Sequence, residues 1–300
     1  MNKFLVLDKV MHGLMSLYAE RVPDVKKITQ AMVQEGIIKK ASDIENDHVA
    51  FRTMGVPQLG LKSFEKIFLH FGYEKRDYFY FDGKKLDAFW YSPPKPHYPR
   101  IFASELRVFD LPENVQKIIK TYTDEVKSDP VDALDLDNGN AVDAFLHTPL
   151  WRTPTWEDYA VLQQNSEYAS WVIYNRYYLN HYTISVHNLP KNFNTIQEFD
   201  AFLERVGIKL NDAGGKIKIS PDGGLLQSST VAQMIDAAFA GGVTHSISGS
   251  YVEFAERKVL PEFQNLPKNL IERKHRRDGF ETANADKIFE STFSSQTGKQ

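Results

Sequence analysis

The sequence predicts an α+β fold in which two βαβββ modules form one curled, mixed sheet around a metal site, with added N-terminal and inserted helices. Three observations predict this fold. Residues 45–110 show the order strand, helix and three strands, and residues 179–260 repeat it. The stretch between them, 111–178, is mostly helical. The repeat is too long for a solenoid unit, so a duplicated module explains it better.

The first module starts with the alternating stretch "NDHVAFRTM", which is typical of a strand. The stretch "LKSFEKIFLHFGY" then spaces its phenylalanines as on one face of a helix, with Ser63 placed to cap it and Gly72 to end it. A hairpin is predicted around Asp82 and Gly83, and "RIFASELRVF" is the last strand.

The second module follows the same plan. "NHYTISVHNL" is predicted as a strand, and the following helix has Thr195 and Glu198 spaced as a capping box. A hairpin is expected around residues 222–224, and "GSYVEFAERKVL" is the last strand. The glycine-rich "AFAGGVTHSISGS" is expected to follow a helix rather than a strand, so it is no dinucleotide fingerprint.

The whole chain, 1–300, is expected to be a single catalytic domain. Residues 1–40 predict two helices divided at Pro23, a residue that suits a helix start. In the insertion, residues 113–127 and 155–178 predict helices, with the loop "DLDNGNA" between them. Residues 261–300 form a tail.

Composition excludes several classes of function. A net charge of −3 leaves no chain-wide nucleic-acid footprint. The absence of cysteine excludes disulfides, zinc–thiolate sites and cysteine nucleophiles. No apolar run approaches the roughly 18 residues that span a membrane, and the N-terminus does not have the pattern of a signal peptide. These features predict a cytoplasmic protein without nucleic-acid or membrane partners.

Each module starts with a histidine and ends with a glutamate: His48 with Glu105, and His181 with Glu253. Side chains alternate along a strand, so His48 shares a face with Arg52. Two imidazoles and one carboxylate at an open site suit non-haem Fe(II). A fourth ligand from Glu105 would instead suit a Lewis-acid site.

A plainer interpretation stands beside this one. A polar sheet face is most often the solvated face, and the chain has nine histidines. His187 is in register with His181 but about 20 Å further along the strand, which is too far to share an ion. The histidines that have no matched module position are expected to be surface or core residues: His12, His70, His97, His147, His245 and His275.

The stretches "DHVAFRT", "NHYTISVHNL", "SYVEFAER" and "GFETANADKIFEST" resemble the 2-oxoadipate dioxygenase/decarboxylase family, also called D-2-hydroxyglutarate synthases. The resemblance covers nearly the whole chain. It implies a vicinal-oxygen-chelate-like core and a place in lysine breakdown. It also implies Fe(II) as cofactor, and O2 and a 2-oxo acid as small-molecule partners.

Carried over residue by residue, the resemblance makes His48, His181 and Glu253 the iron ligands and Arg52 the substrate-binding, catalytic arginine. The chain is shorter after the last ligand than bacterial members, which leaves Ser291 and Thr292 as weaker candidates for a substrate contact. The resemblance assigns Glu105 outside the ligand set, near the site. The tail motif, residues 279–292, is expected to fold over the site as a lid.

The implied reaction is 2-oxoadipate plus O2 to D-2-hydroxyglutarate plus CO2. Two alternatives remain. One is a glyoxalase-like metal isomerase or ring-cleaving dioxygenase on the same modules, which a ligand role for Glu105 would favour. The other is a metal-free binding or structural protein, which predicts no stoichiometric iron and no oxygen uptake.

Overall fold

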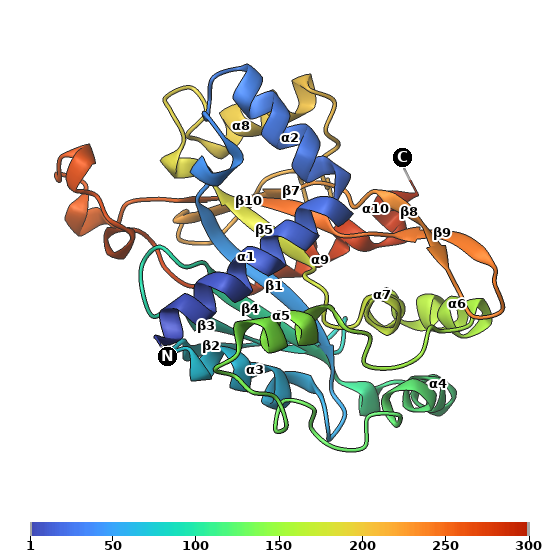
Figure 1. Ribbon diagram of the computed structural model, residues 1–300. Coiled ribbons are helices and arrows are strands. Elements are labelled where there is room, and N and C mark those ends of the chain that lie inside the picture. The colour runs from blue at the N-terminus through green and yellow to red at the C-terminus, as the bar shows by residue number, and fades with distance from the viewer. Residues whose placement is uncertain (1, 299–300) are drawn as a thin grey trace.

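An eight-stranded mixed sheet organises the computed structural model, which describes residues 2–298 (Figure 1). The strand order is β2-β3-β4-β1-β5-β10-β7-β6, and each half has the same arrangement. In each half an edge hairpin is followed by the module's last strand, which runs parallel to its first strand. The two first strands, β1 and β5, meet antiparallel at the centre. The predicted fold class is therefore confirmed.

The strands of the first module are β1 (Asn46–Met54), β2 (Glu74–Phe81), β3 (Leu86–Ser92) and β4 (Arg100–Leu106). Those of the second module are β5 (His181–Ser185), β6 (Lys218–Ile219), β7 (Leu225–Ser229) and β10 (Tyr251–Arg257). A separate two-stranded hairpin lies between β7 and β10 and consists of β8 (Met234–Ala238) and β9 (Thr244–Ser248).

Helices surround the sheet. Two precede it, and each module has one crossover helix: α1 (Lys3–Arg21), α2 (Pro23–Gln34), α3 (Gly60–His70) and α8 (Ile196–Arg205). The insertion and the C-terminal segment hold the others: α4 (Glu113–Thr123), α5 (Gly139–His147), α6 (Trp156–Asn165), α7 (Glu167–Asn175), α9 (Thr282–Phe289) and α10 (Ser294–Thr297). Short 3-10 turns occupy Ala41–Asp43, Val108–Asp110, Val186–Asn188, Pro261–Phe263, Lys268–Leu270, Arg273–His275 and Glu290–Thr292.

The sheet curls around the C-terminal helix. Helix α9 contacts β2 and β6, which are the two opposite edge strands, as well as β7. One helix can touch both edges only if the sheet is strongly curved, so α9 fills the concave side. The crossover helices α3 and α8 bury their phenylalanines against the other face. In Figure 1, α9 is seen behind the central strands and α1 in front of them.

Several sequence-based expectations were wrong in detail. The single helix predicted over 155–178 is two helices, because the backbone at Ser166 is extended and its side chain caps α7. The loop before it contains α5, capped by Asn138. The glycine-rich stretch follows β8 and turns through Gly241 and Gly242, both at positive φ, so no helix precedes it. Ser63 is no cap, since α3 begins earlier at Gly60.

Other local expectations were confirmed. Pro23 occupies the first turn of α2, and the Thr195 side chain accepts a hydrogen bond from the Glu198 backbone N–H. By contrast, the prediction that His187 lies on the same strand as His181 was wrong, because β5 ends at Ser185 and His187 lies in a 3-10 turn. Within residues 2–298, no helix combines the length and apolar character that crossing a membrane requires.

Candidate active site

Three adjacent strands bring the predicted ligand residues together on the concave side. Antiparallel pairing of β1 with β5 sets Ala50 opposite His181, which leaves His48 one pleat away on the same face. Parallel pairing of β5 with β10 sets Thr183 opposite Glu253. One potential donor atom from each of His48, His181 and Glu253 lies within 4.8 Å of the others, and all three side chains are buried.

The two imidazoles present their Nε2 atoms to one carboxylate. His48 Nε2 lies 3.4 Å from Glu253 Oε1, and His181 Nε2 lies 3.0 Å from Glu253 Oε2. Both Nδ1 atoms are occupied elsewhere, at 2.9 Å from Asp47 Oδ1 and at 3.0 Å from Asn180 Oδ1. Each histidine is therefore oriented by the side chain of the residue before it.

This donor set fits a divalent metal ion. His181 Nε2 is buried and, despite its short distance to Glu253, makes no hydrogen bond of acceptable geometry. His48 Nε2 has a hydroxyl neighbour, Thr183 Oγ1, at 2.9 Å. Gln227 donates to Glu253 Oε1 at 2.7 Å, which orients the carboxylate as the neighbours of metal ligands usually do. Two nitrogens and one oxygen on one side of a pocket are the ligands of a facial triad.

The electrostatic environment suits a metal at two of the three predicted ligands. Burial lowers the pKa of His181 to about 4, so this ring is neutral near pH 7. Burial raises the pKa of Glu253, but the positive charge of a protonated His48 and its hydrogen bonds outweigh burial and lower the pKa overall. A neutral imidazole and an ionised carboxylate are the forms that bind a cation. At the third, His48, burial lowers the pKa, but the charge of Glu253 and the hydrogen bond to Asp47 outweigh burial and raise it, so a cation would displace a proton from this ring.

Arg52 lies on the same face as His48, at the pocket wall. Its guanidinium donates to Thr292 Oγ1 at 3.0 Å and to the Phe289 carbonyl at 3.2 Å, while its Nε has no partner. The side chain is 1% exposed, and within the described part of the chain no carboxylate forms an ion pair with it. Burial lowers its pKa. A buried cation without an anionic partner is costly, so this position suits an anionic ligand.

The two weaker candidates lie in the turn after α9. Thr292 accepts a hydrogen bond from Arg52 and is buried beside the pocket. Ser291 faces elsewhere: its Oγ accepts from Asn211 Nδ2 at 2.9 Å and lies 2.8 Å from Ser229 Oγ. The structure thus brings Thr292 to the arginine, and Ser291 to the packing between the turn and β7.

The structure does not bring Glu105 to this cluster. In the β1–β4 pair, Glu105 lies opposite Thr53, whose side chain points away from the face of His48. Its Oε2 accepts from the backbone N–H of Leu61 at 2.8 Å, in the first turn of α3. The residue of the first module that corresponds to Glu253 is instead Phe102. Phe102 lies opposite Ala50, two residues after His48, and Glu253 lies opposite Thr183, two residues after His181. The expectation of a site-facing Glu105 is thus at odds with the strand register.

The pocket over the ligands is small and largely apolar. It leaves about 20 Å³ for water, enough for roughly one molecule. Its walls include Phe102 of β4 together with Phe280, Ile288 and Phe289 of the C-terminal segment. The sequence-based prediction placed the segment 279–292 over the site, but it missed the wall residue Phe102, and it missed Asp47 and Asn180. A polar side chain immediately before each matched histidine was the available signal for the last two.

Comparisons with known proteins identify the family of this chain. The family model for 2-oxoadipate dioxygenase/decarboxylase matches residues 10–272. The chain belongs to this family. A chloroplastic 2-oxoadipate dioxygenase/decarboxylase of Arabidopsis thaliana is 41% identical, over 97% of this chain and 78% of the relative. A chloroplastic/amyloplastic one of Oryza sativa is 43% identical, over 96% and 79%.

Solved structures support the same family and fold. The Oryza sativa hydroxyglutarate synthase, crystallised with 2-oxoadipate, has a TM-score of 0.88 and 41% identity, and the match covers 98% of this chain and 94% of that one. A glyoxalase superfamily protein of Ralstonia eutropha has a TM-score of 0.68 at 18% identity, over 91% and 84% of the two chains, and shows a shared fold only. The predicted vicinal-oxygen-chelate-like fold and the family resemblance are therefore confirmed.

One expectation from the sequence is contradicted. The chain was expected to be cytoplasmic, but both curated plant relatives are named as plastid proteins, chloroplastic in one and chloroplastic/amyloplastic in the other. The expectation came from the lack of a recognisable signal peptide and of apolar runs, and neither feature distinguishes the cytoplasm from the interior of an organelle.

Proposed function

We propose that this protein catalyses the Fe(II)-dependent conversion of 2-oxoadipate and O2 to D-2-hydroxyglutarate and CO2, a step of lysine breakdown. The reaction balances, since six carbons enter and five leave in the hydroxy acid with one as CO2. Besides family membership, the observation that carries the proposal is a buried, unpaired guanidinium beside a buried His-His-Glu cluster.

The proposed cofactor site consists of His48, His181 and Glu253. When bound, Fe(II) supplies the activation of O2 for oxidative decarboxylation of a 2-oxo acid. Three protein ligands leave adjacent positions open on the side of the pocket. Phe102 occupies the position where a fourth carboxylate would complete a Lewis-acid shell, which speaks against the isomerase alternative.

The proposed role of Arg52 is to bind the carboxylate at the far end of the dicarboxylic substrate. Its planar fork can donate two parallel hydrogen bonds, and in a dry pocket such a pair is stronger than in water. Asn180 Nδ2 also lines the pocket and has no hydrogen-bond partner within residues 2–298, so it leaves a further donor free for a polar ligand. The apolar walls exclude bulk water from the reacting group.

The proposed lid is the segment 279–292. Phe280 and α9 fill the concave side, and the space that remains is far too small for a six-carbon dicarboxylic acid. Substrate entry therefore requires these side chains or the segment to move. Once the segment closes again, its turn at Thr292 would lie against the substrate arginine.

The test is anaerobic reconstitution with Fe(II), followed by oxygen uptake against a panel of 2-oxo acids. We expect the fastest uptake with 2-oxoadipate, and equal amounts of O2 consumed, CO2 released and 2-hydroxyglutarate formed. The zinc-loaded protein is the matched control and should consume no oxygen. Absence of uptake with every 2-oxo acid, in a folded protein that holds stoichiometric iron, would refute the proposal.

A further inference from the structure

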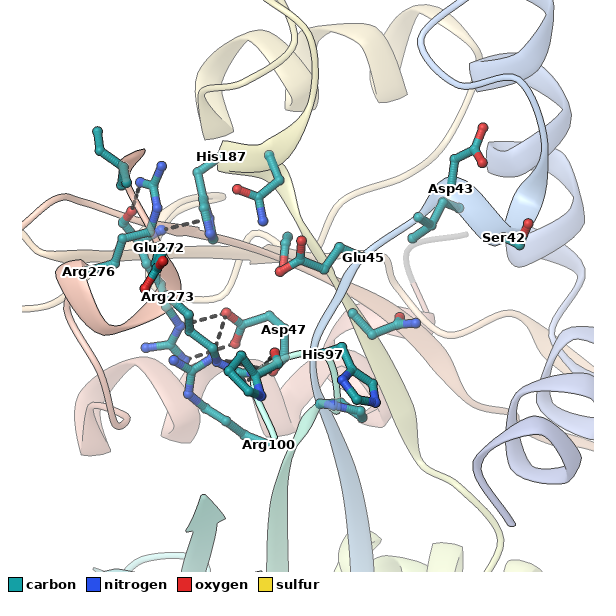
Figure 2. A pocket seen from close by; sticks show the side chains of 18 residues that line it. Ser42, Asp43, Glu45, Asp47, His97, Arg100, His187, Glu272, Arg273 and Arg276 are labelled. Carbon is teal, nitrogen blue, oxygen red and sulfur yellow. Dashed lines mark hydrogen bonds and ion pairs between the residues drawn. The ribbon is translucent and has the colours of Figure 1, made fainter. Parts of the chain in front are cut away.

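We propose that Asp47 is a positioning residue that fixes the orientation of His48 and links it to the segment covering the pocket. The inference rests on the ligand role proposed above for His48. Asp47 is 2% exposed and lies on the far side of the imidazole from the pocket. Its carboxylate lies between that imidazole and the guanidinium groups of Arg100 and Arg257. Asp47 and Arg100 also line a second cavity of about 600 Å³ (Figure 2).

The arginines fix the carboxylate in place. Arg257 binds it in bidentate fashion, with Nε 2.6 Å from Oδ2 and Nη2 2.9 Å from Oδ1. Arg100 Nη1 adds a third contact to Oδ2, at 3.2 Å. A bidentate pair constrains direction as well as distance. Because the carboxylate of Asp47 cannot rotate, the imidazole that donates to it is held in one ring plane and one tautomer.

The second histidine provides an internal comparison. His181 Nδ1 has the neutral Asn180 Oδ1 at 3.0 Å, and among the described residues no arginine forms a hydrogen bond with that amide. The two modules thus use the same device, an acceptor on the preceding residue, but only the first module uses a charged one. An anionic acceptor makes the opposite ring nitrogen a stronger donor to a metal. The effect of removing the charge should therefore be specific to His48.

The same arginines hold the covering segment. Arg257 Nη1 donates to the Gly279 carbonyl at 2.7 Å, and Arg100 Nε donates to the Asp278 carboxylate at 2.6 Å. Phe280 follows directly, and its ring centroid lies 4.7 Å from that of the first imidazole. The same two arginines therefore help to position both His48 and Phe280, the aromatic side chain that covers it.

The experiment measures metal affinity without turnover. Co(II) is titrated into the purified protein and its visible absorption spectrum is recorded. Asp47→Asn keeps an acceptor for the imidazole but removes the charge, and it should weaken Co(II) binding by about 10- to 100-fold and change the spectrum. Glu256→Gln is the matched control, because it removes another buried carboxylate, which lies one residue before Arg257 and accepts from the Ile196 backbone N–H. The control should bind Co(II) like the wild type.

The link to the covering segment is measured by limited trypsin digestion, since Arg276 and Arg277 lie just before this segment and Lys287 lies within it. Co(II) should slow cleavage there in the wild type and should not slow it in Asp47→Asn. Unchanged affinity and spectrum in a folded Asp47→Asn variant would overturn the positioning role, and equal protection in both proteins would overturn the link to the segment.

A second variant keeps the idea testable if Asp47→Asn does not fold. Arg100→Lys retains the charge but loses the planar fork, so it should weaken Co(II) binding in the same direction by less; no weakening overturns the proposal. His48→Ala separates the two levels of inference. If it binds Co(II) normally, the proposed metal site itself fails, whereas normal binding by the Asp47 and Arg100 variants alone defeats only the positioning role.

Discussion

Replacing Arg52 by Met is expected to raise the KM for 2-oxoadipate strongly while the fold survives. The guanidinium is 1% exposed, and its partners are neutral: Thr292 Oγ1, the Phe289 carbonyl, and the ring faces of Tyr168 and Trp171 at 5.2 and 5.1 Å. No carboxylate within residues 2–298 forms an ion pair with it. The ion pair with the substrate therefore forms in a dry site, where it has its full strength.

The magnitude follows from that burial. A close, desolvated charge pair loses roughly 2–5 kcal/mol when one partner is truncated, which corresponds to about 30-fold to several-thousand-fold in affinity. Methionine has a similar reach and removes the cost of burying an unpaired charge. The free energy of unfolding should therefore stay within about 1 kcal/mol of the wild type, or rise.

The assay compares initial oxygen uptake with 2-oxoadipate and with 2-oxohexanoate, which has the same chain length but lacks the far carboxylate. Arg52→Met should lose much more with the first substrate than with the second. Arg107→Met is the matched control, because that arginine pairs with Asp87 and Asp110 outside the pocket. Equal losses on both substrates, or a destabilisation large enough to explain them, would refute the assignment of the far carboxylate to Arg52.

Three further predictions test the site and its scaffold. His181→Ala should abolish bound iron and turnover, because a facial triad has no spare ligand; His12→Ala, on the exposed side of α1, should keep both in metal analysis. Glu105→Gln should keep full iron but lose about 0.3–1 kcal/mol of stability in urea titrations, since only a charge at the start of α3 is removed; iron loss would return Glu105 to the ligand set. Burial raises the pKa of Asp200 to about 7, above the unfolded value near 3.9, so its contribution to stability is present at low pH and is lost as pH rises to about 7. Asp200→Asn should therefore be more stable than the wild type by up to a few kcal/mol at pH 8 and by less at pH 5; an equal difference at both pH values would contradict this.

Much of the sheet could be predicted from the periodicity of apolar residues. Each long strand and crossover helix has an uninterrupted row of apolar side chains on the side that faces the core. The errors occur where a capping side chain or a glycine turn, rather than the spacing of apolar residues, determines the local structure. Ser166 interrupts an otherwise helical pattern by capping α7 with its own side chain. The β8–β9 hairpin has few buried residues, and its turn depends on glycines at positive φ, so it carries little hydrophobic signal.

For the site, alternation predicts which face of its strand a residue lies on, but it does not predict how neighbouring strands are aligned. His48, His181 and Arg52 follow from alternation within a strand, and the structure places them on the pocket side. Glu105 was paired with Glu253 by matching letters in the two modules, but the correct pairing depends on register between strands, which a single sequence does not contain. The wall residue Phe102 was out of reach for the same reason. The position of Phe280 and α9 was expected from the family's tail motif alone, since they pack on strands far away in the sequence.

The strand register also explains why neither module can form this site alone. The first module has a histidine at the ligand position, an arginine four residues later, and Phe102 where the second module has its carboxylate. The second module has His181 and Glu253, with Ser185 where the first has its arginine. The two modules thus offer equivalent sets of positions, and the two sets differ in chemistry. In the proposed site, one half would contribute a ligand and the anion-binding group, and the other half would contribute the remaining two ligands. The aromatic residue in place of a fourth ligand would keep that side of the pocket open for a substrate.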